Sequence, residues 1–275
     1  MSEKKSSRTL INILGIPSIL AIIIAGDTFY QLPIFSFFIA TVLYLGVREI
    51  PILVKGINGQ PFLPLLIIFI AILQIDRHPY IMWNIPLYNL IIGLTLLAMV
   101  TEIFRNKPTP LINISTIIFA FVWLGMMLGS LSALRNMPTI GFSITLALIV
   151  SVWICDTAAF GFGYKFGKRK ILPEVSPKKT WVGSIAGFLS SVIFILILYY
   201  FDFFTYNISQ IDALILGAIT GIFGQFGDFS ESLLKRNANI KDTSNFLRGH
   251  GGILDRFDSL AFAAPLALIY FHYYI

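Results

Sequence analysis

The residues best suited to chemistry lie near the end of the chain, between positions 224 and 259. Among the carboxylates of this stretch are Asp228, Asp255 and Asp258, and its cations include Lys235 and Arg236. Carboxylates hold metal ions, and lysine and arginine hold phosphate groups, so the combination is typical of phosphoryl-type chemistry. If the segment after Asp228 is helical, its positions three, four and seven residues on lie on the same face.

The choice of ligands favours Mg²⁺ over zinc. Zinc prefers histidine and cysteine, and this stretch has one histidine, His250, and no cysteine. Mg²⁺ is typically bound by one or two carboxylates together with substrate phosphates. Two simpler readings stay open: Asp228 and Glu231 cap or pair within a helical turn, and His250 serves as phosphate donor, proton carrier or turn residue.

A second polar stretch, residues 155–187, precedes another apolar segment. Its glycine-lysine portion lacks the spacing of a phosphate-binding loop. Lys178, Lys179 and Thr180 stand where a helix begins, and free N–H groups there favour a phosphate. The alternative is that the two lysines only anchor the helix at a membrane interface. Asp156 lies at the inner end of an apolar run, where a carboxylate is costly and usually pairs or binds something.

These residues must be positioned by membrane helices. Of the 275 residues, 56% are hydrophobic and only 12% are charged, and the mean hydropathy is +0.81. Soluble domains carry about 25% charged residues. We predict an all-α, polytopic integral membrane protein with about nine transmembrane helices. The expected spans are 10–26, 29–47, 62–75, 80–100, 111–132, 139–160, 181–201, 209–227 and 259–275. The single cysteine, Cys155, excludes an intramolecular disulfide and is expected to be a buried core residue.

The distribution of positive charge predicts the orientation. With the N-terminus in the cytoplasm, eighteen of the 20 lysines and arginines fall in cytoplasmic segments, and only Arg77 and Arg135 fall outside. Such an excess in cytoplasmic loops is the usual rule for membrane proteins. We therefore expect a cytoplasmic N-terminus and an active site that faces the cytoplasm. Part of this charge also attracts anionic lipid headgroups.

Two stretches of the sequence resemble a known family, the phosphatidate cytidylyltransferases (CDP-diacylglycerol synthases). The stretch SLLKRNANIKDTSNFLRGHGGILDRFDS, residues 232–259, resembles the long signature of that family, and SPKKTWVGS, residues 176–184, resembles a second landmark. Two positions depart from the pattern. Arg248 stands where the family usually has proline, and Val182 stands where it has glutamate after the Thr-Trp pair.

The resemblance implies a reaction of CTP with phosphatidate that gives CDP-diacylglycerol and pyrophosphate. It implies one membrane-embedded domain over residues 1–275, with the catalytic region near 155–259, in the cell's inner or plasma membrane. Mg²⁺ would be held by Asp228 and Asp255, with a second, monovalent cation as a further option. The expected partners are CTP, phosphatidate, membrane lipid and a second copy of the chain in a homodimer, and no nucleic acid. The other site residues expected from it are Lys178, Lys179, Lys235 and Arg236 for phosphates and Thr180, Asp156, Asp242, His250, Arg256 and Asp258 around them.

Three rival hypotheses remain at this stage. A CTP-dependent enzyme for another lipid phosphate, ether-linked or polyprenyl, would use the same headgroup chemistry. A membrane transporter would instead spread its charged residues along helix midpoints, whereas here they cluster at one face. A catalytically inactive relative that serves as a binding protein is suggested by Val182.

Overall fold

The computed structural model describes residues 15, 17–26, 33–78, 80–81, 83–205, 208–244 and 251–273. Over these residues the protein is helical, and no β-strand is present; the nearest feature is an isolated antiparallel bridge between Lys170 and Thr180. The all-α prediction is confirmed. The helices are α2 (Ile34–Val54), α3 (Leu63–Asp76), α4 (Leu87–Arg105), α5 (Pro110–Ala120), α6 (Ser130–Arg135), α7 (Gly141–Phe166), α8 (Trp181–Tyr200), α9 (Gln210–Ala218), α10 (Gly224–Asn237) and α11 (Leu254–Tyr273).

Six helical stretches in the described part of the chain are long and apolar enough to cross a membrane, and each overlaps one of the expected spans. They are Ile34–Ile57, Leu87–Arg105, Pro110–Arg135, Gly141–Phe166, Trp181–Tyr200 and Gln210–Asn237. Two expected spans begin late, because Pro33 and Pro86 occupy the N-cap positions of α2 and α4. The chain is therefore a helical protein with several membrane-spanning segments.

The other three expected spans are not among these six. The segment 62–75 forms α3, whose 14 residues are fewer than the roughly 20 that a perpendicular crossing needs. Of the segment 259–275, residues 259–273 belong to α11, which has 20 residues but carries Asp255, Arg256 and Asp258 in its first turns. Of the segment 10–26, only residues 15 and 17–26 are described, and residues 17–25 are helical.

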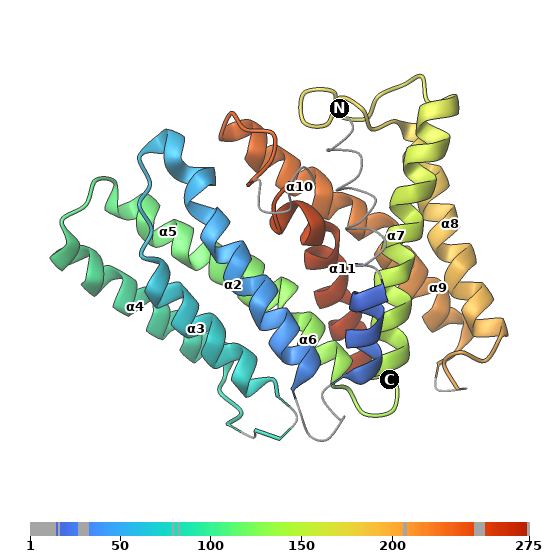
Figure 1. Ribbon diagram of the computed structural model, residues 1–275, viewed down its shortest axis with the longest axis horizontal. Helices are drawn as coiled ribbons and strands as arrows, with labels where there is room; N and C mark the ends of the chain where they lie inside the picture. Colours follow the sequence, from blue (N-terminus) through green and yellow to red (C-terminus); the bar gives the residue numbers. More distant parts are fainter. Residues whose placement is uncertain are drawn as a thin grey trace.

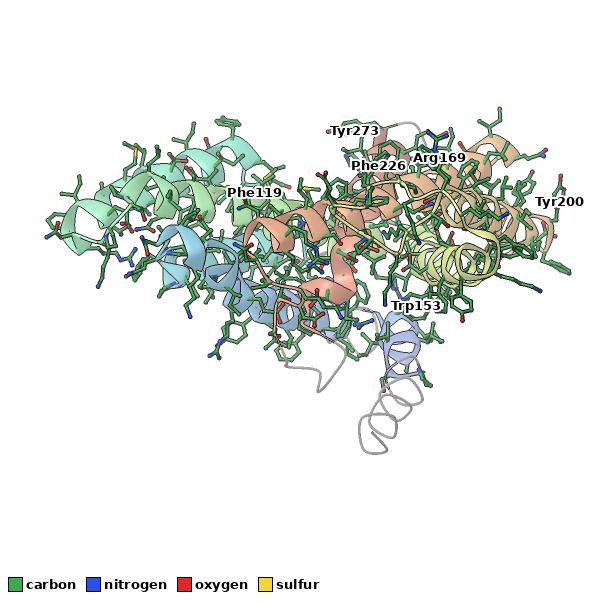
Figure 2. The ribbon with its side chains drawn as sticks, turned by 90° about the horizontal axis from the view of Figure 1, so that it is seen from above. Phe119, Trp153, Arg169, Tyr200, Phe226 and Tyr273 are labelled. Atoms are coloured by element: carbon green, nitrogen blue, oxygen red, sulfur yellow. The ribbon has the colours of Figure 1, made fainter. Side chains whose placement is uncertain are left out.

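Helix α11 lies in the middle of the molecule, between α2 on one side and α7 on the other, with α10 above it in the view of Figure 1. It packs against α6, α7 and α10 and against the π-helical segment Phe121–Leu128. Its small residues Ala261, Ala263, Ala264 and Ala267 are buried in these contacts. Large side chains such as Tyr200 and Tyr273 project from the periphery (Figure 2), as expected where lipid is the solvent.

Helices α7 and α8 pack closely through small residues. A Cβ added at Gly187 would lie 2.9 Å from the carbonyl oxygen of Cys155, and one at Gly183 would lie 3.1 Å from the Cα of Gly163. Small residues let membrane helices approach at backbone distance. The contact fixes both ends of the loop at 167–180, which begins at α7 and ends at α8. Cys155 is free and buried there, as predicted.

A π-helical segment, Ile219–Phe223, joins α9 to α10 in one continuous span. The backbone N–H of Gly224 bonds to the carbonyl of Ile219, five residues earlier. The Gln225 side chain donates to the Gly221 carbonyl at 2.5 Å and to the Ser184 carbonyl at 3.0 Å. Such segments are frequent at functional sites, and the amide here satisfies a carbonyl and ties α10 to α8.

Candidate active site

The charged residues of the site come from α7, the loop at 167–180, α10 and the start of α11. The loop and the C-terminal end of α10 lie at the same end of the molecule (Figure 1). Lys179, at the end of the loop, places its Nζ 2.5 Å from Oδ2 of Asp228 on α10. The same ammonium lies 4.2 Å from the centroid of the Phe229 ring. The loop is thus joined to α10 by an ion pair and a cation–π contact.

A second lysine–carboxylate pair joins α10 to α11. Nζ of Lys235 lies 2.5 Å from Oδ1 of Asp255 and 3.3 Å from Oε2 of Glu231. These side chains are largely buried, with exposed fractions of 10% for Lys235, 9% for Asp255 and 0% for Glu231. The positions 228, 231 and 235 share a helix face, as the spacing predicted. Two of the three lysines predicted to hold phosphate, Lys179 and Lys235, therefore pair with the two carboxylates predicted to hold metal.

Glu231 is a site residue that the sequence analysis did not select. Its carboxylate is fully buried and forms a 3.3 Å ion pair with Lys235. It lies within electrostatic reach of Asp255 and Asp258. The signal that could have found it was present, because Glu231 lies three residues after Asp228 and four before Lys235.

The turn before α11 holds the second oxygen of Asp255. Oδ2 accepts hydrogen bonds from the backbone N–H of Gly252 at 2.6 Å and from the backbone N–H of Thr243 at 3.1 Å. Gly251, the residue before Gly252, has a φ of +81°, in the left-handed region that favours glycine. A glycine is favoured at this position because the turn directs the Gly252 N–H back to the carboxylate.

Further carboxylates surround the Lys179–Asp228 pair. Asp258 on α11 interacts electrostatically with Asp228, and Asp156 in the second half of α7 interacts with both. Lys179 and Arg256 are the cations close enough to offset Asp156. Several carboxylates brought together repel one another, so a bound cation lowers the energy of the group.

The structure gives two of the expected phosphate-binding residues structural contacts. Thr180 is buried and caps α8, because its Oγ1 accepts a hydrogen bond from the Gly183 N–H at 3.2 Å. Arg236 donates to the carbonyls of Val175 at 3.2 Å and Ile240 at 3.1 Å, so it fastens the loop to α10.

The remaining expected residues lie at the rim of the site or beyond it. Lys178 and Asp242 are exposed, and so is Val182 in the first turn of α8. Thr243, the neighbour of Asp242, is buried instead and points inward. His250 and Arg248 lie outside the described residues.

A buried carboxylate from the N-terminal half also reaches this region. Glu49, near the end of α2, accepts hydrogen bonds from the hydroxyls of Thr243 at 2.7 Å and Ser244 at 2.6 Å. It also accepts from the backbone N–H groups of Ile253 at 2.9 Å and Leu254 at 3.0 Å. Nothing in its local sequence marks it, because all four partners lie at least 194 positions away.

The donor set fits Mg²⁺ better than a metal that needs a complete protein cage. Within the described residues, no group of three or more histidine, cysteine, aspartate or glutamate side chains is arranged to hold a metal ion. Mg²⁺ requires less, since one or two carboxylates and substrate phosphates complete its shell with water. Asp228 and Asp255 supply that number of carboxylates beside Lys179 and Lys235.

The combination of carboxylates and lysines at one end of the helices is typical of a site for phosphoryl-type chemistry. Comparison with known proteins gives the class: residues 6–274 match the model of the cytidylyltransferase family. Because this match covers nearly the whole chain, the protein belongs to the cytidylyltransferase family.

Individual relatives that match the chain are phosphatidate cytidylyltransferases. The chain is 32% identical to a phosphatidate cytidylyltransferase of Staphylococcus haemolyticus (strain JCSC1435), over 94% of this chain and 96% of the relative. It is 34% identical to that of Bacillus subtilis (strain 168), over 66% of this chain and 65% of the relative. It is 44% identical to that of Staphylococcus aureus (strain COL), over 46% and 48% of the two chains. The family predicted from the two motifs is confirmed.

Proposed function

We propose that this protein transfers CMP from CTP to phosphatidate, giving CDP-diacylglycerol and pyrophosphate. The observation that carries the proposal is the double pairing of Lys179 with Asp228 and Lys235 with Asp255 at one end of the membrane helices. The printed names of its relatives point to the same reaction. In the reaction, an oxygen of the lipid phosphate bonds to the α-phosphorus of CTP while the bond to the β-phosphate oxygen breaks.

Each residue of the two pairs has a role in this proposal. Asp228 and Asp255 would hold Mg²⁺, which supplies charge neutralisation for two anions that must meet. With the carboxylates engaged by the metal, Lys179 and Lys235 would be left to bind phosphate oxygens, since an ammonium presents three donors. The lysines thus keep the carboxylates neutralised before substrate arrives and hold the phosphates afterwards.

The finer topology belongs to the same proposal: about nine crossings, a cytoplasmic N-terminus and a site that opens to the cytoplasm. It is supported by the eighteen basic residues on one side and by the charged first turns of α11. Single cysteines at Lys170 and at Thr205, in a Cys155→Ser background, test it with a membrane-impermeant maleimide on sealed vesicles. Cytoplasmic labelling of position 170 alone supports this orientation, and labelling of position 205 from the cytoplasmic side contradicts it.

The activity test is incorporation of labelled CTP into lipid by the purified protein in detergent. We expect product that requires both phosphatidate and Mg²⁺ and that is lost in Asp255→Asn. Glu102→Gln is the matched control, because Glu102 is a buried carboxylate of α4 that pairs with Arg105 and Asn113 away from the site. Product made only from a different lipid phosphate would overturn the substrate, and no lipid product at all would overturn the reaction.

A further inference from the structure

Glu49 connects the N-terminal helices to the site, and its carboxylate is fully engaged there. The residue is 5% exposed and accepts four hydrogen bonds from residues 243–254, all between 2.6 and 3.0 Å. A carboxylate has about four lone-pair positions, so these donors use its whole capacity. Burial of a charge is costly without such partners, and this degree of satisfaction holds the side chain in one orientation.

Two of the four donors belong to the start of α11. Leu254 is the first residue of α11 and Ile253 directly precedes it, and at this end a helix has no internal acceptors for its N–H groups. A negative charge at that end also interacts favourably with the helix dipole. Glu49 therefore acts as the cap of α11 from a different helix, one that stands about two hundred positions earlier in the chain.

One of the other two donors, Thr243, leads to Asp255. Oγ1 of Thr243 lies 2.7 Å from Oε2 of Glu49 and 3.1 Å from Oδ2 of Asp255. A hydroxyl has one proton, and the shorter contact assigns it to Glu49. The backbone N–H of Thr243 then donates to Asp255 at 3.1 Å. Thr243 is held by Glu49 through its side chain and holds Asp255 through its backbone.

The space around this connection excludes a role for Glu49 in binding a ligand. A Cβ at Gly252 would overlap Oγ1 of Thr243 and both carboxylate oxygens of Glu49, so the turn lies directly on the carboxylate. One turn earlier on α2, a Cβ at Gly46 would lie 3.1 Å from Cδ2 of Leu254. The start of α11 is therefore seated against α2 with no room for a substrate group between them.

We propose that Glu49 is a positioning residue: through Thr243 and the first turn of α11, it orients Asp255 to bind the catalytic Mg²⁺. The inference rests on the proposed function in one respect, the role of Asp255 as a metal ligand. Residues that orient metal ligands typically change metal affinity 10–100-fold when they are replaced. The N-terminal half of the chain would thus contribute to metal affinity without touching metal or substrate.

The test compares Glu49→Gln with Glu102→Gln. Glutamine keeps the shape of Glu49 but replaces one acceptor oxygen with an NH₂ group, which must face donors. Mn²⁺ binding is measured by electron paramagnetic resonance on the detergent-purified protein without nucleotide, and thermal midpoints are recorded for both variants. We expect Mn²⁺ binding about tenfold weaker in Glu49→Gln and unchanged in Glu102→Gln.

A second variant keeps the inference falsifiable if Glu49→Gln folds poorly. Thr243→Val keeps the shape and removes only the hydroxyl, so Glu49 retains three donors; we expect weaker Mn²⁺ binding with a smaller loss of thermal midpoint than in Glu49→Gln. Lower midpoints with wild-type Mn²⁺ affinity in both variants would show that Glu49 serves the fold alone. Because Mn²⁺ binding needs no turnover, a wild-type protein that binds Mn²⁺ but makes no CDP-lipid would refute the proposed function and leave this comparison valid.

Discussion

Replacement of Lys235 by methionine should destabilise the protein far more than the same change at Lys179. Lys235 is buried between Asp255 and Glu231, whose side chains are 9% and 0% exposed. Methionine keeps most of the apolar stem and removes the charge, so it leaves two buried carboxylates without their cation. Loss of one partner from a buried pair typically costs about 3–5 kcal/mol.

The Lys179 pair is different because water reaches both partners. The side chains of Lys179 and Asp228 are 25% and 32% exposed, and pairs accessible to solvent contribute about 0–1 kcal/mol. Since 1 kcal/mol shifts the midpoint by about 2–4 °C in chains of this size, Lys235→Met should lower it by roughly 6–20 °C. Lys179→Met should lower it by no more than about 4 °C.

Thermal unfolding of both variants in the same detergent, with and without Mg²⁺, measures these differences. In Lys235→Met, Mg²⁺ should raise the midpoint by more than it does in the wild type, because the cation neutralises the carboxylates that the ammonium had balanced. Equal losses in the two variants, or a Lys235→Met midpoint that Mg²⁺ does not change, would refute the assignment of Lys235 as the buried counter-ion of Asp255 and Glu231.

Three other substitutions test the helices that position the site. Thr180→Ala removes the cap of α8 and should cost about 1 kcal/mol, measured as a lower thermal midpoint; an unchanged midpoint would show that the cap is dispensable. Gly227→Ala places a methyl group against the Asp258 carbonyl where α10 meets α11, so we expect about 1–3 kcal/mol of destabilisation and reduced lipid product. Gly161 lies in α7, and a Cβ added there meets nothing within 4 Å, so Gly161→Ala should instead stabilise the protein by about 0.5–1 kcal/mol. A lower thermal midpoint in this variant would contradict the described packing.

The sequence predicted the parts of the site that local spacing determines. Asp228 and Lys235 were placed on one helix face by the helical period, and Thr180 was placed at a helix start; the structure bears out both. The choice of Asp255 over other carboxylates came from the motif that resembles the family signature. Local periodicity alone could not select it, because its partners Lys235 and Thr243 lie on other elements.

What the sequence could not predict depends on contacts between distant segments. Glu49 follows an apolar run and reads as the polar end of a membrane helix. Arg236 reads as a phosphate ligand, but it fastens the loop through the Val175 carbonyl 61 positions away. The late start of α2 at Ile34 and of α4 at Leu87 was in principle readable from the prolines before them.

The π-helical segment Ile219–Phe223 limits the insertions and deletions that the continuous helix from α9 to α10 can accept. One extra residue in a turn rotates everything after it by about 100°, so the face that carries Asp228 and Lys235 is turned relative to the face that α9 presents to α8. Removal of a single residue from this segment would leave the composition of the site intact and direct its carboxylate and ammonium away from α11. A sequence alignment that places a one-residue gap here therefore compares different faces of the helix, and a chimaera joined at this point must keep the exact residue count.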